Sequence, residues 1–465
     1  MIKYMYRFIL LIALIFSTFS NTSAQSSGIH IGRASQVINP EIGGWVQGAG
    51  VPRQAERIRD DLEANAVYLK KGKEQLILVS CDLVGLEPWY NTRLRELMGV
   101  ASGIPVRNII ISSTHTHGGP SLVKTNYLMP LDTVYMDKLE VWMVELAEEA
   151  VRSAVPGKVG WVKDELQIGY NRRLTWADGS HTMHGNAKRT DFTGLEGPDD
   201  PQHTAIFFKD LKDNLLAIAY HNTTHPTIFY ADGVYSADFP GETRKSFRSQ
   251  FDENLSVLYL NGAQGDISME NMLDRKKETD EEKIQRISKM VFDKTMEMYD
   301  SGVEYEMNPV LRHNYEDLKV AVRLPSPEVL TESREILDRI DEGEEIRGME
   351  MIMAFGSVHL QETFGHAPFD ILPIHAIRLG ELAIVTQSCE LYCQFGLDIK
   401  RRSPVDNTIV VGLSDGLNGY CPTIYGFLGG GYSGAPISWT RLEPYAGYKI
   451  VETASQLLNK LWQEE

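Results

Sequence analysis

The sequence has 465 residues, of which 43% are hydrophobic and 9% aromatic, and its net charge is −17. This composition is typical of a globular protein and argues against a disordered chain. The strong negative charge argues against nucleic acid as a partner and against electrostatic docking on an anionic membrane. Only four cysteines occur, none in a Cys-x-x-Cys pair, so a disulfide framework and a thiolate zinc finger are not expected.

The N-terminus has the layout of a secretory signal peptide. Lys3 and Arg7 form a basic region, and a mostly apolar run over residues 8–19 follows. Small residues then close a predicted signal peptide over residues 1–24. The apolar run is too short to span a bilayer, which needs about 20 residues. We therefore expect residues 25–465 to be exported to the periplasm or secreted, with no transmembrane segment after cleavage.

Strand and helix patterns alternate along the remaining chain. Short apolar runs predict strands over residues 66–69, 75–84, 108–112, 204–208, 215–220, 256–260, 382–386 and 408–413. Apolar residues at helical spacing predict helices over residues 137–154, 279–299 and 332–341. Strands interleaved with helices favour an α/β fold of layered mixed β-sheets flanked by helices.

Two polar stretches interrupt this pattern. Residues 179–202 are rich in Gly, Asp and Pro and predict a long loop. Residues 323–350 are charged and largely helical in pattern, as expected of an insertion that caps one edge. We expect one catalytic domain over residues 25–465 that carries these insertions.

The first candidate metal-binding element follows the predicted strand over residues 108–112. His115 and His117 stand two residues apart, so both side chains lie on one side of an extended segment. Gly118–Pro120 then predicts a turn with an accessible backbone. Imidazoles at strand ends are common zinc ligands, although a pair of polar turn residues would show the same pattern.

A second pair of histidines follows the predicted strand over residues 215–220. His221 and His225 stand there, and Pro226 prevents the chain from continuing in the sheet. Four of the twelve histidines thus gather at two strand ends, which favours a metal site. Asp238, a little further on, either orients a metal-bound imidazole or caps a helix.

Three motifs in this order resemble the neutral/alkaline non-lysosomal ceramidase family: Thr114–Pro120 (THTHGGP), His225–Thr227 (HPT) and Gly265–Ser268 (GDIS). Weaker matches lie at Gly44–Gln47, residues 50–57, Asp82, Asn171–Arg172 and residues 390–432. The resemblance implies a zinc-dependent amidase that cleaves the N-acyl bond of ceramide or a related N-acylated lipid by zinc-activated water. It covers only the N-terminal catalytic domain of that family.

The resemblance also implies a set of site residues. The Zn²⁺ ligands would be His115, His225, Glu390 and Tyr420. Four such ligands without a thiolate suit a zinc ion that acts as a Lewis acid.

Three further residues complete the implied site. His117 would contact substrate or water, and Arg172 would hold a polar group of the substrate or stabilise the developing oxyanion. Ser268 matches the catalytic serine of the family. It would be a nucleophile or a hydrogen-bond partner of the attacking water, and its sequence also fits a small residue in a turn.

The sequence departs from the family pattern at several positions. Ser388–Cys389 replaces a Pro-Gly before Glu390, Asp415 replaces an Asn, and Gly118 replaces a Ser. These changes bear on the substrate more than on the metal. The alternatives are therefore a zinc-dependent esterase or deacetylase acting on acylated glycans, and a non-catalytic binding protein that retains the fold, either metal-containing or metal-free. A Cys389–Cys421 disulfide is also permitted if Glu390 and Tyr420 share one ion.

Overall fold

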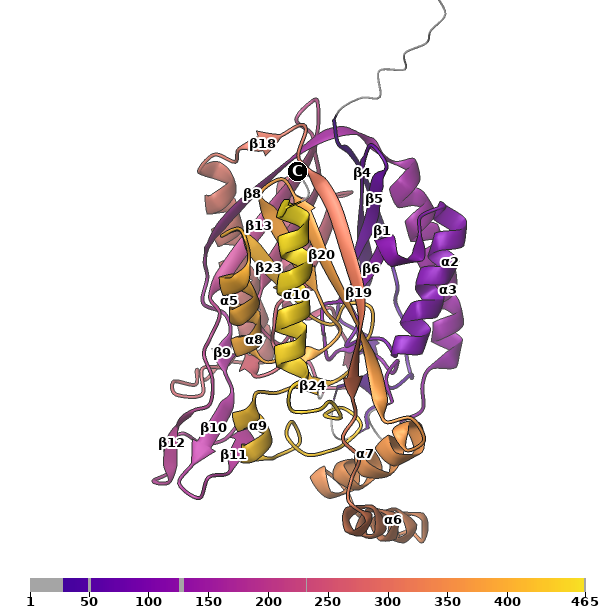
Figure 1. Cartoon of the computed structure of the whole chain (residues 1–465), viewed down its shortest axis with the longest axis vertical. Helices are drawn as coiled ribbons and strands as arrows, with labels where there is room; N and C mark the ends of the chain where they lie inside the picture. The colour runs from indigo at the N-terminus through magenta and orange to yellow at the C-terminus, as the bar shows by residue number, and fades with distance from the viewer. Residues whose placement is uncertain (1–27, 49–51, 125–128, 231, 464–465) are drawn as a thin grey trace, which may run out of the picture.

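The computed structural model describes residues 28–48, 52–124, 129–230 and 232–463, so the predicted signal peptide lies outside the described residues. The fold has four layers: helices, a large sheet, a smaller sheet and further helices (Figure 1). The predicted α/β class of layered mixed sheets flanked by helices is confirmed.

The large sheet consists of two halves. In spatial order its strands are β16 (Ser256–Asn261), β14 (Leu215–Asn222), β13 (Gln202–Asp210), β8 (Val155–Glu165), β1 (His30–Val37), β4 (Glu63–Lys71), β5 (Glu74–Cys81) and β6 (Ile109–Ser113), with β18 (Tyr305–Glu306) paired to β8. Only two residue pairs, His30 with Pro156 and Ile31 with Val155, join β1 to β8. The outermost pair in each half, β5–β6 and β14–β16, is parallel.

The smaller sheet packs against the large one. Its order is β19 (Leu311–Ala321), β20 (Phe369–Leu379), β21 (Leu382–Thr386) and β23 (Thr408–Val411), and the β21–β23 pair is parallel. Buried aliphatic side chains from both sheets form one shared core, for example Ile110 and Leu258 with Ile377 and Ile384. Each such side chain stabilises the fold by about 1.5–3 kcal/mol through removal of apolar surface from water.

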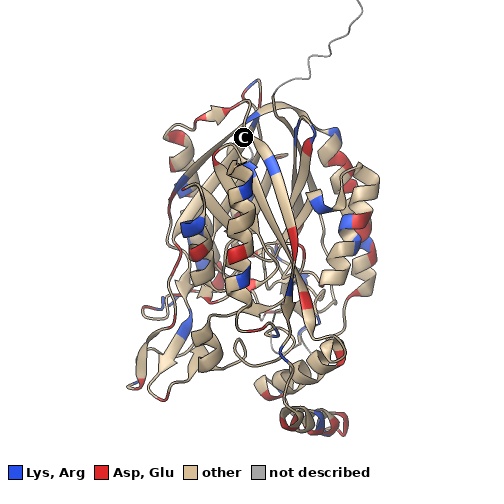
Figure 2. Cartoon of the chain, viewed as in Figure 1, with Lys and Arg blue, Asp and Glu red and all other residues tan. Residues whose placement is uncertain are grey.

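Helices cover the two outer faces. α2 (Pro88–Ser102) and α3 (Thr133–Arg152) cover β1, β4, β5 and β6, while α4 (Asp238–Gln250) and α5 (Asp280–Asp300) cover β13, β14 and β16. α8 (Cys393–Arg402) and α10 (Ala446–Gln463) cover the smaller sheet. Along several of these helices, charged residues lie between uncharged ones (Figure 2), and hydrophobic residues of each helix belong to the buried core. Each helix therefore buries one apolar stripe, as an amphipathic helix should.

Several short elements gather at the lower end of the molecule in Figure 1: α6 (Pro327–Asp341), α7 (Met349–Phe364), α9 (Ile424–Gly429), β10 (Arg173–Trp176), β11 (His181–Met183) and β12 (Phe192–Leu195). Residues 323–350 are largely helical as predicted. The prediction of one long loop over residues 179–202 is wrong in part, because β11 and β12 both pair with β10. Strands of three or four residues are too short to show a recognisable period of two.

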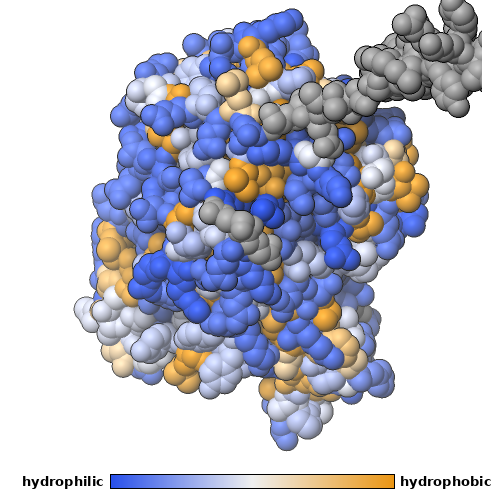
Figure 3. Space-filling view, turned by 45° about the horizontal axis from the view of Figure 1, so that its top comes forward, coloured by the Kyte–Doolittle hydropathy of each residue, from blue (hydrophilic) through white to orange (hydrophobic). Residues whose placement is uncertain are grey.

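The remaining elements are a 3₁₀ turn, η1 (Val106–Asn108), and four two-stranded pairs. The pairs are β2 (Val46–Gln47) with β7 (Gly119–Pro120), β3 (Arg57–Ile58) with β15 (Val234–Tyr235), β9 (Tyr170–Asn171) with β17 (Ile267–Ser268), and β22 (Glu390–Leu391) with β24 (Tyr420–Cys421). On the face shown in Figure 3, apolar side chains form small separate groups between hydrophilic ones. No helix in the described parts of the chain is long and apolar enough to cross a bilayer.

Candidate metal centre

The predicted site residues follow the ends of strands from both sheets. His115 follows β6, His225 follows β14, Glu390 follows β21 and Tyr420 follows β23. β6, β14, β21 and β23 are each a member of a parallel pair. Loops at the carboxyl ends of such strands meet at one edge, where α/β proteins commonly bind ligands.

His115 is held in place by the segment that directly follows β5. Its backbone N–H donates to the carbonyl of Leu83 (2.9 Å), and its ring Nδ1 lies 2.5 Å from the carbonyl oxygen of Val84. A carbonyl only accepts hydrogen bonds, so Nδ1 carries the proton and Nε2 of a neutral ring carries a lone pair. The φ angle of 69° is uncommon for a residue other than glycine, and such strain persists only where the surroundings hold it.

His117 is arranged in the same way. Its Nδ1 lies 3.1 Å from the carbonyl oxygen of Gly48, and its Nε2 lies 3.3 Å from Nε2 of His115. Burial, and next the neighbouring His115, lowers the pKa of His117 to about 3, so the ring is neutral and Nε2 carries a lone pair. Gly48 permits this contact, because it has φ +116° and a Cβ there would lie 2.5 Å from Nδ1.

His225 is fully buried and receives a hydrogen bond from Arg172, whose Nη2 lies 2.8 Å from Nε2 of His225. A guanidinium only donates, so this imidazole nitrogen also carries a lone pair. Burial, and next the positive charge of Arg172, holds the pKa of His225 well below its ordinary value. Its Nδ1 is buried without a hydrogen-bond partner.

Glu390 brings a carboxylate to the same point. Its Oε2 lies 3.1 Å from Nε2 of His225 and 3.4 Å from Nε2 of His115. Gly265 lets the backbone pass close to this residue, because a Cβ at position 265 would lie 2.4 Å from the carbonyl oxygen of Glu390.

These spacings fit a tetrahedral metal ion. Zn–N bonds of about 2.0–2.1 Å place neighbouring ligand atoms about 3.3 Å apart. Nε2 of His115 lies 3.3 Å from Nε2 of His117 and 3.4 Å from Oε2 of Glu390, and Nε2 of His225 lies 3.1 Å from the same oxygen. The ligand atoms of the three histidines all lie within 4.8 Å of one another. Lone pairs and a carboxylate at such distances repel unless a cation lies among them. The buried set His115, His117 and His225 could therefore hold a metal ion, and the geometry adds His117 to the possible ligands.

Tyr420 and Arg172 lie beside this cluster. β22 and β24 pair Glu390 with Tyr420 in register, and Nη2 of Arg172 donates to the Tyr420 hydroxyl (3.3 Å) and to the carbonyl of Gly265 (3.1 Å). Burial, and next the negative charge of Glu390, raises the pKa of Tyr420 well above its ordinary value. Nε of Arg172 is buried with no hydrogen-bond partner.

Ser268 lies on β17, which pairs with β9, the strand that ends one residue before Arg172. It pairs with Tyr170 in the β9–β17 pair and is 3% exposed. Its hydroxyl oxygen accepts a hydrogen bond from the backbone N–H of Glu270 (2.9 Å), which leaves its own proton to donate elsewhere. Its catalytic role stays a prediction.

Two other residues considered from the sequence have structural roles. Nδ1 of His221 lies 2.8 Å from the carbonyl oxygen of Leu260, and the ring is not part of the histidine cluster. The Asp238 carboxylate, at the first residue of α4, accepts hydrogen bonds from the N–H groups of Ile228 (2.6 Å) and Phe239 (2.7 Å). α4 is capped by Ala237, so Asp238 is its first helical residue and not the cap expected from the sequence.

Cys421 lies on β24 directly after Tyr420, and Cys389 directly precedes Glu390 and β22. Both are buried free thiols in hydrogen-bond contact with each other. The sequence permitted a bridge here, and the structure has two adjacent thiols instead.

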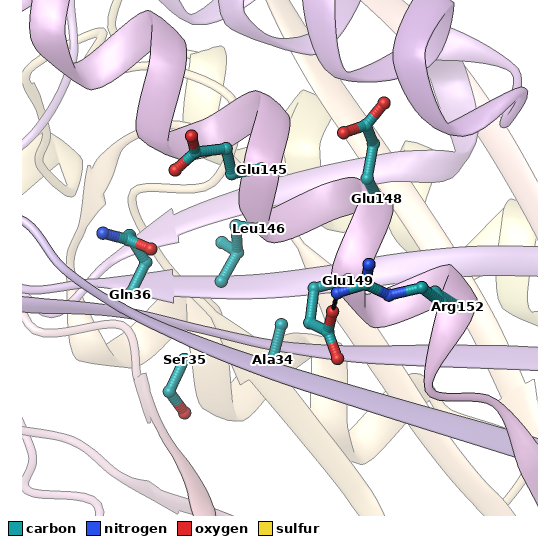
Figure 4. A pocket seen from close by; sticks show the side chains of 8 residues that line it. All are labelled: Ala34, Ser35, Gln36, Glu145, Leu146, Glu148, Glu149 and Arg152. Atoms are coloured by element: carbon teal, nitrogen blue, oxygen red, sulfur yellow. Dashed lines mark hydrogen bonds and ion pairs between the residues drawn. The ribbon is translucent and has the colours of Figure 1, made fainter.

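Neither of two surface pockets contains a predicted site residue. One lies between β1 and the last turns of α3 and is lined by Ala34, Ser35, Gln36, Glu145, Leu146, Glu148, Glu149 and Arg152 (Figure 4). The other, lined in part by Trp89, Trp439 and Gly419, lies beside the segment that precedes Tyr420.

Comparison with solved structures identifies the fold of this chain. No family model matches the chain, and no curated protein matches it in sequence. Among solved structures, the neutral ceramidase from Pseudomonas aeruginosa matches with a TM-score of 0.71 at 14% identity, covering 94% of this chain and 75% of that one. The chain has the neutral ceramidase fold. A structure of a ceramidase complexed with C2 matches equally well, with a TM-score of 0.71, 16% identity and the same coverage. The resemblance predicted from the sequence motifs is thus confirmed by the structural match.

Proposed function

We propose that this protein is an exported zinc-dependent amidase that cleaves the N-acyl bond of ceramide or a related N-acylated lipid. The observation that carries the proposal is the convergence of imidazole nitrogens and the Glu390 carboxylate at zinc-ligand spacing, within the neutral ceramidase fold. We assign His115, His225, Glu390 and Tyr420 as ligands. The export part rests on residues 1–24 of the sequence alone.

The chain's own residues suit amide hydrolysis. A bound zinc ion would supply Lewis acidity and a nucleophile at neutral pH. Arg172 would donate its unpartnered Nε–H to the acyl oxygen, where negative charge develops as the carbonyl is attacked. His117, neutral and with Nε2 unprotonated, would accept a hydrogen bond from substrate or from the attacking water. Ser268 would donate its hydroxyl proton to the same region.

The helix that follows Tyr420 supports a lipid substrate. α9 exposes two large apolar side chains three residues apart, Tyr425 (70%) and Leu428 (77%). Such residues lie on one face of a helix. A buried arginine fixes this helix in place, because Arg173 donates to the carbonyls of Gly426 (3.3 Å) and Gly430 (3.2 Å). α9 begins four residues after the candidate ligand Tyr420 and thus offers apolar surface for an acyl chain.

The test is a metal assay followed by a substrate panel on the purified protein. We expect one zinc ion per chain and release of fatty acid from N-acylsphingosines. The panel also contains acylated sugars and N-acetylated sugars, which represent the esterase and deacetylase alternatives. Turnover of sugars without any release from ceramides would replace the lipid amidase by one of those activities.

A metal-free outcome would favour the third alternative. If the protein contains no metal, and His115→Ala changes neither its stability nor its activity, the zinc proposal is wrong. The protein would then be a binding protein that retains the fold.

A further inference from the structure

One loop connects three of the four segments that carry candidate ligands. Residues 413–419 lead from β23 to Tyr420 and are buried throughout. Leu413 and Asp415 adopt left-handed φ angles of 51° and 62°, which are uncommon for residues other than glycine. Strained backbone of this kind persists where surrounding contacts over-determine it, and it clusters at functional sites.

The first contacts of this loop fix the segment that leads to His115. The backbone N–H of Ser113 donates to the carbonyl of Leu413 (3.1 Å), and the N–H of Asp415 donates to the carbonyl of Ile111 (2.8 Å). Ser113 stands two residues before His115. The loop is thereby hydrogen-bonded to β6, a strand of the large sheet.

The last contacts of the loop fix the segment that carries Glu390. The N–H of Asn418 donates to the carbonyl of Ser388 (2.9 Å), and the N–H of Glu390 donates to the carbonyl of Gly419 (2.9 Å). Tyr420 follows directly. The relative positions of the two sheets at the candidate centre therefore depend on this loop.

The Asp415 side chain anchors the loop in turn. Its Oδ1 accepts a hydrogen bond from the N–H of Ile111 (2.9 Å), and its Oδ2 lies 2.7 Å from Nε2 of His375 and 3.3 Å from Nη1 of Arg95. Nδ1 of His375 lies 2.9 Å from Nε2 of His313, which extends the network along the small sheet. The carboxylate thus joins β6, β20 and α2. The side chains of Asp415 and His375 are fully buried.

We propose that Asp415, held by Arg95 and His375, is a positioning residue that aligns His115, Glu390 and Tyr420 around one metal ion. The proposal rests on the proposed zinc function. It gives a structural role to position 415, where this sequence has Asp and the family has Asn. A carboxylate can accept from Arg95, His375 and a backbone N–H together, whereas an amide presents an N–H₂ group to one of these donors.

The test compares Asp415→Asn with Glu63→Gln. Glu63 is a comparably buried carboxylate on β4, and its ion pairs are with Arg244 and Arg248 of α4. Zinc affinity is measured by chelator competition, and hydrogen–deuterium exchange is measured on metal-free protein. We expect Asp415→Asn to weaken zinc binding by about 10–100-fold, as for partners that orient metal ligands. Exchange should rise in peptides spanning residues 111–117 and 387–391, and Glu63→Gln should change neither quantity.

Arg95→Met provides a second variant that leaves the loop sequence intact, should Asp415→Asn fold poorly. It should shift zinc affinity and exchange in the same direction by a smaller factor. Normal zinc affinity and unchanged exchange in folded Asp415→Asn or Arg95→Met would overturn the inference while leaving the zinc function intact. If wild-type protein binds no zinc, the proposed function fails and the metal-positioning inference fails with it. The exchange data then show separately whether Asp415 still orders the loop.

Discussion

The two halves of the candidate centre are built differently. The histidine half, His115, His117 and His225, follows β6 and β14 of the large sheet, strands of five and eight residues, and each histidine stands within a few residues of its strand. The other half, Glu390 and Tyr420, stands on the two-residue strands β22 and β24, which pair with each other. The histidine half therefore depends on local strand ends, and the Glu390–Tyr420 half depends on contacts between distant segments.

From this difference we infer which residues should be most sensitive to substitution. A side chain at the end of a long strand is held by the sheet even when a neighbour is altered. A two-residue strand contributes little order of its own, so its position must come from the tertiary contacts around it. The following variants test the two halves against each other.

The largest effect is expected in the histidine half from His225→Ala. The imidazole is fully buried, and its loss removes a proposed ligand beside Glu390. Because a catalytic metal stabilises the transition state by several kcal/mol, turnover should fall by about 1,000-fold or more, together with bound zinc. Metal content and fatty-acid release are measured on the same sample. His366→Ala, at an exposed histidine, is the control and should retain both.

In the other half, Glu390→Gln should have the next largest effect. The amide keeps the shape of the side chain but removes the negative charge that lies 3.1 Å from His225 and 3.4 Å from His115. We expect zinc affinity to fall by more than the roughly 10–100-fold typical of residues that only orient ligands. Chelator competition measures it. Unchanged affinity would remove Glu390 from the ligand set and leave the histidine half to bind metal alone.

A paired comparison of Tyr420→Phe with His117→Gln decides which half supplies the fourth ligand. If Tyr420 binds zinc, removing its hydroxyl should weaken zinc binding by about tenfold, close to the net value of one charge-assisted contact. His117→Gln should then leave zinc affinity near normal and lower turnover. The opposite pattern would make His117 the ligand and would place the fourth ligand in the histidine half.

The smallest effect on zinc binding is expected from Ser268→Ala, a residue outside both halves. If the hydroxyl only donates a hydrogen bond to the attacking water, turnover should fall by about 10–100-fold, as for one hydrogen bond to a developing charge. Single-turnover kinetics with an N-acylsphingosine measures this. A complete loss of turnover with normal zinc content would indicate a nucleophile, and near-normal turnover would exclude that role.

The sequence alone determined the fold class and the histidine half. Apolar runs of five to ten residues and helical spacing are local properties, so most interior strands and the helices α3, α5 and α6 were predictable. Histidines that directly follow such strands were visible for the same reason. The edge strand β19 was missed, because its sequence is largely polar and half of it faces solvent, as edge strands often do.

Glu390, Tyr420, Arg172 and Ser268 were indicated only by the resemblance to a family, since no local pattern marks them. Tertiary structure alone decided that Glu390, Tyr420 and Arg172 lie together. Their strands are two residues long or absent, and their positions come from hydrogen bonds between segments hundreds of residues apart, such as Asp415 with Ile111. For the same reason, the sequence did not predict that the carbonyls of Val84 and Gly48 orient His115 and His117. The positions at which strands end are encoded locally in the sequence. The packing of the two sheets determines which of these strand ends lie close together.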